Sequence, residues 1–117
     1  MPNREWTLSV KDIFTSANKI LAYAGGINRE EFFKDTKTYD AVLRNLGIIG
    51  EAAKNIPNEI REKYTNVEWK KMAGLRDVTI HQYFGINEDV LWDIVSRKIP
   101  ELQTNIAAVL NQINVQN

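Results

Sequence analysis

The chain has 117 residues, of which 44% are hydrophobic and 26% are charged, the balance of a soluble globular protein with its own core. Fifteen basic residues balance fifteen acidic ones, which gives no support to a protein that coats DNA or RNA through its overall charge. The absence of cysteine excludes disulfides, thiol catalysis and cysteine metal sites, and a single histidine argues against a zinc site.

The start of the chain and its apolar runs bear on where the protein resides. The first residues lack the basic start and long apolar run of a signal peptide. No apolar stretch approaches the roughly 18 residues that a membrane span needs. We therefore expect a cytoplasmic protein without membrane contact that forms one domain over residues 1–117, with a frayed polar tail at 114–117.

The apolar pattern at the start of the chain predicts two helices. Apolar residues recur every three or four positions over residues 7–24, which indicates one buried helical stripe. Gly25 and Gly26 end this helix. Asn28 followed by Glu31 has the spacing of a capping box and predicts a short second helix.

A long helix is predicted over residues 36–56, and it contains two glycines. Gly47 and Gly50 lie inside the helix, where each costs about 1 kcal/mol relative to alanine. We expect another helix to approach the backbone closely there, either in the same chain or in a partner subunit. Glu51 and Lys54 flank the buried stripe, and the ordinary interpretation of such charged residues is a solvated surface.

The middle of the chain predicts one short and one longer helix. Pro57 ends the preceding helix and opens the short one, over residues 58–64. Residues 69–84 predict the longer helix, which Gly85 ends. Gly74 lies inside this helix and is expected to loosen its backbone or to admit a close neighbour.

Two further helices complete the predicted fold. Asn87 caps the first, and its predicted buried stripe is Val90, Leu91, Ile94 and Val95. Pro100 begins the second, over residues 101–113. No segment alternates apolar and polar residues as a half-buried strand does. The predicted fold is therefore all-α, a single-domain antiparallel helical bundle with about four main helices plus short ones.

Residues 69–84 also concentrate the side chains that can do chemistry. They include the only histidine, His81, with Arg76 five positions before it and Tyr83 two positions after it. Successive helical residues are rotated by about 100°, so Arg76 and Tyr83 lie within about 20° of each other, whereas Arg76 and His81 are about 140° apart. Asp77 shares a face with His81, where a carboxylate orients an imidazole or holds its proton.

These side chains suit phosphate chemistry, because arginine binds phosphate oxygens through a fixed fork and histidine exchanges protons near neutral pH. Arg76 and His81 can line one groove through long side chains or across a dimer axis. The alternative is structural, since a single helical histidine is more often a packed residue and an Arg-Asp pair is usually a solvated surface. No nucleotide-binding glycine loop, zinc-protease motif or serine triad occurs, and we expect neither a cofactor nor a metal.

Three stretches of the chain together resemble one known family. They are AGLRDVTIHQYF, VLRNLGIIGEAAKNIP before it and VLWDIVSRKIPEL after it. On these stretches the chain resembles the HepT-like family of HEPN-domain proteins over nearly its whole length, from about Ser9 to Leu110. The most specific part of the resemblance is the spacing R-x4-H-x-Y, preceded by AGL and followed by FG.

The resemblance implies an all-α homodimer in which the motif arginine and histidine of both subunits line a shared cleft. It also implies a metal-independent endoribonuclease that acts as the toxin of a toxin–antitoxin pair. By position, His81 is the acid or base, Arg76 holds the scissile phosphate of the RNA substrate and Asp77 supports them. The implied antitoxin is a minimal nucleotidyltransferase that silences the toxin by attaching AMP to the motif tyrosine, here Tyr83.

The sequence leaves two other functions open. In the first, the chain is a non-catalytic helical partner and substrate of the nucleotidyltransferase, with Arg76 and His81 positioning Tyr83 or binding the nucleotide. In the second, it is a structural dimerisation bundle, which leaves the grouping of these side chains unexplained. For a nuclease with no net charge we expect a modest grip on RNA, confined to the cleft, and a preference for unpaired RNA.

Overall fold

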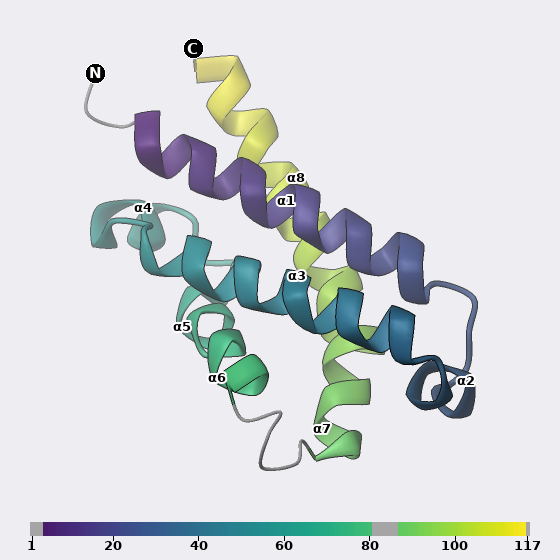
Figure 1. Cartoon of the computed structure of the whole chain (residues 1–117). Coiled ribbons are helices and arrows are strands. Elements are labelled where there is room, and N and C mark those ends of the chain that lie inside the picture. The colour runs from purple at the N-terminus through teal and green to yellow at the C-terminus, as the bar shows by residue number, and fades with distance from the viewer. Residues whose placement is uncertain (1–3, 81–86, 117) are drawn as a thin grey trace.

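The computed structural model describes residues 4–80 and 87–116, and all regular secondary structure in these two ranges is helical. Figure 1 shows the helices packed as a bundle, which measures 45 × 28 × 20 Å. This arrangement confirms the all-α bundle that the apolar periodicity predicts. The elements are α1 (Arg4–Ala24), α2 (Arg29–Lys34), α3 (Thr36–Lys54), α4 (Asn58–Lys63), α5 (Trp69–Ala73), α6 (Leu75–Ile80), α7 (Glu88–Asp93), η2 (Ile94–Lys98) and α8 (Ile99–Gln116).

Helices α1 and α3 form the centre of the bundle. They run antiparallel and pack along their lengths, and α8 packs against α1 as well (Figure 1). Each of the two central helices buries one stripe of apolar residues spaced by three or four positions, as the sequence predicts. The buried apolar residues are Trp6, Val10, Ile13, Ala17, Ile20 and Ala24 on α1, and Val42, Leu43, Leu46, Ile49, Ala52 and Ala53 on α3.

The short helix α2 leads the chain into α3 through two caps. The side chain of Asn28 accepts the Glu31 N–H at 2.9 Å, and Glu31 accepts the Asn28 N–H at 3.0 Å, so the predicted capping box is confirmed. Asp35 then caps α3, accepting the backbone N–H of Thr38 at 3.1 Å and its hydroxyl at 2.7 Å. Phe32 is completely buried beside these caps. Hydrogen bonds and apolar packing therefore hold this corner together.

The other end of α3 is closed by the segment that follows it. Arg61 of α4 donates hydrogen bonds to the carbonyls of Ala53 at 2.8 Å and Ile56 at 3.1 Å. These carbonyls lie at the end of α3 and just beyond it, where the regular helical bonding stops, and the Ala53 carbonyl also accepts the Ile56 N–H at 3.3 Å. The buried indole of Trp69 donates to the Tyr64 carbonyl at 3.0 Å. These bonds fix the start of α5 against the bundle.

The C-terminal third differs from the prediction of two separate helices. Helices α7, η2 and α8 follow one another without a break, and η2 is a π-helical turn. Pro100 has no N–H for the carbonyl of Ser96, and its ring would clash with that carbonyl in an ordinary α-helix. The wider π turn, in which the Ile99 N–H bonds to the Ile94 carbonyl, accommodates the proline and lets the helix continue.

Helix α7 confirms its predicted cap and corrects its predicted inner face. The Asn87 side chain accepts the Val90 N–H at 3.1 Å, as expected of a cap. Val90 is nevertheless 53% exposed, so its assignment to the buried stripe is wrong. Leu91 and Val95 are buried as predicted and form the inner face, and Val90 is rotated about 100° from Leu91 on the helix.

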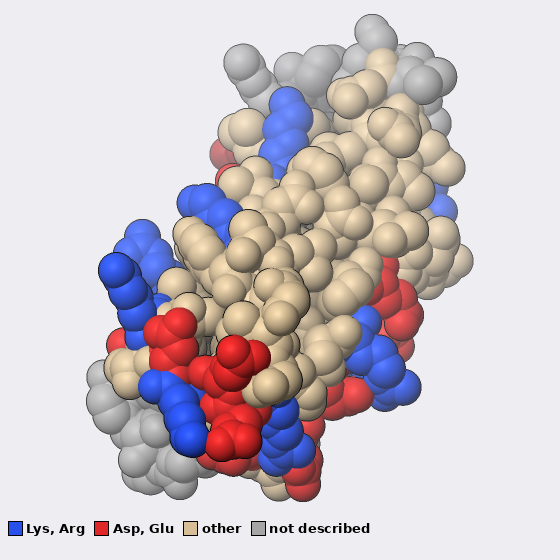
Figure 2. Space-filling view, turned by 90° about the vertical axis from the view of Figure 1, so that its right-hand side faces the viewer, with Lys and Arg blue, Asp and Glu red and all other residues tan. Residues whose placement is uncertain are grey.

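Charged side chains of both signs are mixed on the face shown in Figure 2, where they gather below a broad uncharged band. Arg29 of α2 pairs with Asp89 of α7 at 2.6 Å, and Lys34 pairs with Glu30 at 2.8 Å. Mixed charges of this kind create no extended field of one sign over this face. Within residues 4–80 and 87–116, no helix is both long and apolar enough to cross a membrane.

Candidate functional site

The helix predicted over residues 69–84 is interrupted at Gly74, where α5 ends and α6 begins. Gly74 has φ −68° and ψ −16°, and the Asp77 N–H bonds to the Gly74 carbonyl at 3.0 Å. This three-residue spacing is typical of a 3₁₀ turn. Glycine favours the interruption because it is about 1 kcal/mol less favourable than alanine within a helix. As a result, Arg76 lies in the first turn of a short separate helix.

Helix α6 crosses α3 at Gly50. A methyl group at Gly50 would lie 2.6 Å from the backbone nitrogen of Arg76 and 2.9 Å from its Cβ. Carbon atoms in contact normally stay about 3.5–4.0 Å apart, so only glycine lets the two helices come this close. The close approach predicted at Gly50 is therefore confirmed, and the neighbour is a helix of the same chain.

The Arg76 side chain forms an ion pair with Glu51, the residue that follows this glycine. Nη1 of Arg76 contacts Oε1 of Glu51, and the two side chains are 41% and 52% exposed. The guanidinium is thus held on the side of α3 and remains accessible to solvent. Glu51 is solvent-exposed, as expected, and its carboxylate in addition binds the arginine of the motif.

The remaining motif residues are placed only in part. Asp77 is exposed in the first turn of α6, next to Arg76 in the chain, where a carboxylate interacts favourably with the helix dipole. His81 and Tyr83 lie outside the described residues. The pairing of Asp77 with His81 and the proximity of Arg76 to Tyr83 therefore stay predictions.

Glu51 is the site residue that the sequence patterns miss. Spacing along one helix identifies neighbours three or four positions apart, whereas Glu51 and Arg76 belong to different helices. One signal did mark the position: Gly50 indicates where a second helix crosses α3. A charged residue beside such a glycine is a candidate partner for the crossing helix.

A cavity of about 410 Å³ lies between α5 and α6 and the continuous C-terminal helix. Its apolar lining comes from Val67, Met72, Leu75, Val90, Ile94, Ile99 and Leu102. Leu75 lines this cavity but Arg76 does not. The cavity is therefore separate from the exposed side chain of Arg76.

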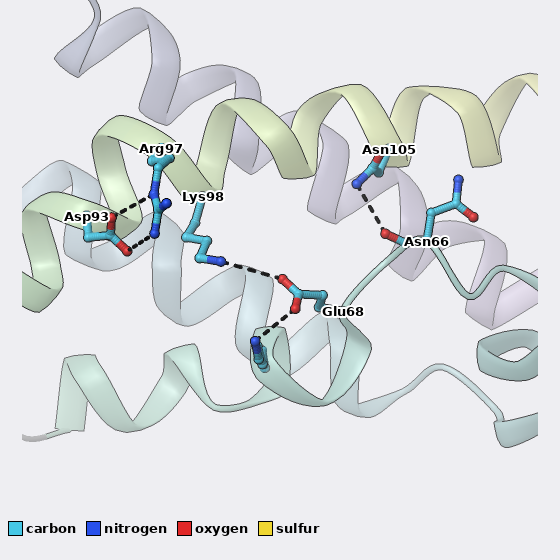
Figure 3. Close-up of polar contacts among 7 residues, drawn as sticks. Asn66, Glu68, Asp93, Arg97, Lys98 and Asn105 are labelled. Atoms are coloured by element: carbon cyan, nitrogen blue, oxygen red, sulfur yellow. Dashed lines mark hydrogen bonds and ion pairs between the residues drawn. The ribbon is translucent and has the colours of Figure 1, made fainter.

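Polar contacts bridge the edge of this cavity (Figure 3). Glu68 pairs with Lys71 at 2.9 Å and with Lys98 of η2 at 3.9 Å, and Asn105 of α8 donates to the Asn66 carbonyl at 3.2 Å. The hydrogen bond and the charge of Lys71 lower the pKa of Glu68, and the same contact raises the pKa of Lys71. These contacts tie the α5 segment to the C-terminal helix.

Comparison with known proteins identifies related chains that carry a functional name. A protein of Methanocaldococcus jannaschii, named as a candidate RNase, is 42% identical over 97% of this chain and 93% of its own length. A protein of Caldanaerobacter subterraneus with a similar name is 46% identical over 74% of this chain and 78% of its own. A Thermococcus cleftensis protein named "Probable ribonuclease HepT" is 43% identical, covering 80% and 86%. No solved structure matches the chain.

Residues 13–109 match the family described as "Ribonuclease HepT-like". The matched range contains the whole R-x4-H-x-Y motif, together with Gly50 and Glu51 on α3. The match covers most of the chain, and the relatives above extend over similar lengths. The chain belongs to the HepT-like ribonuclease family.

Proposed function

We propose that the chain is a metal-independent endoribonuclease whose site combines Arg76 and His81. The observation that carries this proposal is the R-x4-H-x-Y motif inside the range that matches the ribonuclease family. The position of Arg76 supports it, because its side chain is 41% exposed and its guanidinium is held by Glu51, so that an RNA phosphate can reach it.

In the proposed reaction the RNA supplies its own nucleophile. His81 removes the proton of a 2′-hydroxyl, whose oxygen then forms a bond to the adjacent phosphorus. The bond from phosphorus to the 5′-oxygen breaks, and that oxygen takes a proton from a second acid. The products are a 2′,3′-cyclic phosphate and a 5′-hydroxyl. Arg76 stabilises the negative charge on the phosphate oxygens, which a metal ion would otherwise do.

We further propose that the active form is a homodimer. The reaction needs a base and an acid, whereas each chain has one histidine. A two-fold axis through the cleft would bring two copies of His81 and Arg76 together. Sedimentation of the purified protein at assay concentration tests this point. An RNA-cleaving monomer would contradict it.

The toxin role and its silencing by a nucleotidyltransferase are part of the same proposal. In this modification AMP is transferred from ATP to the Tyr83 hydroxyl, with release of pyrophosphate. The attached AMP is a bulky anion on a residue close to Arg76 in the sequence, and it competes with the substrate phosphate for the guanidinium. Of the other tyrosines, Tyr64 is 5% exposed and so poorly accessible, whereas Tyr23 is 43% exposed and lies on α1. Burial of Tyr39 raises its pKa.

The modification is tested with the partner enzyme. A minimal nucleotidyltransferase supplied with labelled ATP should transfer label to the wild-type chain and not to Tyr83→Phe, while Tyr23→Phe should be labelled like the wild type. Equal labelling of Tyr83→Phe and the wild type would show that another residue is modified.

The nuclease proposal is tested by cleavage of a labelled single-stranded RNA in EDTA. Wild-type protein should cut the RNA, and His81→Ala, purified identically, should not, although it remains folded. Equal cleavage by His81→Ala would place the activity elsewhere. If neither protein cuts RNA, the chain is better explained as the non-catalytic partner and substrate of the nucleotidyltransferase.

A further inference from the structure

We propose that Glu51 is a positioning residue of the nuclease site, which sets the direction of the Arg76 guanidinium. This inference rests on the proposed function, because it concerns how the phosphate-binding arginine is held. Glu51 thereby joins the proposed site from α3, a helix outside the motif. The adjacent Gly50 contributes by allowing α6 to approach α3 closely.

The backbone of Arg76 is placed by the contact between α6 and α3. Helix α6 is short, but its first turn rests directly on α3, where Gly50 leaves room for the nitrogen and Cβ of Arg76. Helix α3 has 19 residues and lies in the centre of the bundle (Figure 1). The backbone of Arg76 is thus placed by a long, well-packed helix.

The side chain of Arg76 is placed by its ion pair with Glu51. A half-exposed arginine has many rotamers, so its position on the backbone alone does not aim its charge. Glu51 follows Gly50 on α3, and its Oε1 contacts Nη1 of Arg76. Helix α3 therefore contacts both the backbone of Arg76, at Gly50, and its guanidinium, through Glu51.

The exposure of the ion pair indicates that Glu51 positions the Arg76 guanidinium without covering it. A carboxylate that enclosed the guanidinium would hide it from RNA, whereas the Arg76 side chain is 41% exposed while paired. Arginine has five N–H donors and can hold a carboxylate and a phosphate through different edges. The structure is that of an oriented and accessible cation.

The experiment compares Glu51→Gln and Glu51→Asp with the wild type and with a matched control, Glu68→Gln. Glu68 is also half exposed and ion-paired, but it contacts Lys71 and Lys98 at the edge of the separate cavity. We expect Glu51→Gln to lower kcat about tenfold or more, because a small displacement of a catalytic group is costly. KM for single-stranded RNA should change less than about threefold, because Arg76 keeps its charge. Glu51→Asp should recover part of kcat.

The melting temperature distinguishes this role from a structural one. A half-exposed ion pair contributes little stability, so Glu51→Gln should melt within about 4 °C of the wild type. An unchanged kcat in Glu51→Gln would overturn the proposal. Tighter RNA binding with unchanged kcat would show in addition that Glu51 masks the arginine. An equal loss of kcat in Glu68→Gln would also overturn it.

A second measurement separates this proposal from the nuclease assignment. If the wild type cuts no RNA, the proposed function fails, and the arginine side-chain N–H signals in a ¹⁵N NMR spectrum then decide the matter. Positioning predicts a shifted, slowly exchanging signal for Arg76 in the wild type that moves to the range of mobile arginines in Glu51→Gln. An Arg76 signal that is identical in both proteins would overturn the proposal.

Discussion

The two contacts that α3 makes with α1 and with α6 are built in opposite ways. Towards the bundle centre, α3 buries large apolar side chains such as Leu46 and Ile49, which are completely enclosed. Towards α6 it presents Gly50, followed by a half-exposed ion pair. Burial of apolar area stabilises a fold strongly, whereas exposed ion pairs contribute about 0–1 kcal/mol. One helix thus combines a stabilising face with a face that places a charge.

This comparison predicts that the two faces respond differently to substitution. Changes at the α6 contact should reduce RNA cleavage more than they reduce stability. Changes in the buried stripe should reduce stability and leave the activity of each folded molecule intact.

The largest effect is expected from Arg76→Ala. Removal of the guanidinium should lower the rate of RNA cleavage at least about 100-fold, because it takes away the charge that we propose stabilises the phosphate. The melting temperature should change by only a few degrees, about 4 °C at most. Arg97→Ala is the matched control. The Arg97 side chain is 69% exposed and pairs with Asp93 at a distance of 2.9 Å, and neither residue belongs to the motif. Equal losses of activity in both variants would contradict the assigned role.

Leu46→Ala should have the largest effect on stability. Leu46 is completely buried, and truncation of such a residue costs about 2–5 kcal/mol of the free energy of unfolding. Urea unfolding measures this loss. Cleavage per folded molecule, measured well below the unfolding transition, should equal that of the wild type. A large loss of activity in the fully folded variant would show that the two faces of α3 are coupled.

Gly50→Ala should affect both properties. The added methyl group would lie 2.6 Å from the Arg76 nitrogen, so α6 must shift, at a cost of about 1–3 kcal/mol and with reduced cleavage. Gly74→Ala is the control for stability. Its methyl group would lie 3.3 Å from the Lys71 carbonyl oxygen, and its free energy of unfolding should stay within about 1 kcal/mol of the wild type. Equal unfolding free energies for Gly50→Ala and the wild type would disprove the close approach.

The smallest effect concerns the acid side of the pH–stability profile. Hydrogen bonds from the hydroxyl and the backbone N–H of Thr38 lower the pKa of Asp35 below its ordinary value of 3.8. The stabilisation is therefore present above that value and is lost as the pH falls through the lower pKa of the folded state. Asp35→Asn keeps a capping side chain but does not titrate. Its melting temperature should fall less than that of the wild type between about pH 6 and pH 3. Identical pH profiles would contradict this.

Local patterns in the sequence predict most of the fold. The stripes of α1 and α3 follow from apolar spacing, and the capping box at Asn28 follows from one asparagine and one glutamate. The continuous C-terminal helix was not predicted, because Pro100 ordinarily begins a helix. The π turn before it supplies a backbone path that residue preferences do not reveal.

The candidate site was predictable only within one helix. The motif placed Arg76 and Asp77 together, and Gly50 indicated that some helix would cross α3. The pairing of Glu51 with Arg76 depends on how α6 lies on α3 after the interruption at Gly74, which is a tertiary property. Patterns of spacing therefore found the arginine and missed the residue that holds it.

The most direct measurement is the initial rate at which a labelled single-stranded RNA is cut in EDTA by wild type, Arg76→Ala, His81→Ala and Arg97→Ala, side by side. The proposed site predicts cleavage by the wild type and Arg97→Ala, with at least about a 100-fold loss in the other two. Folded Arg76→Ala or His81→Ala that cuts as fast as the wild type would contradict the proposed site.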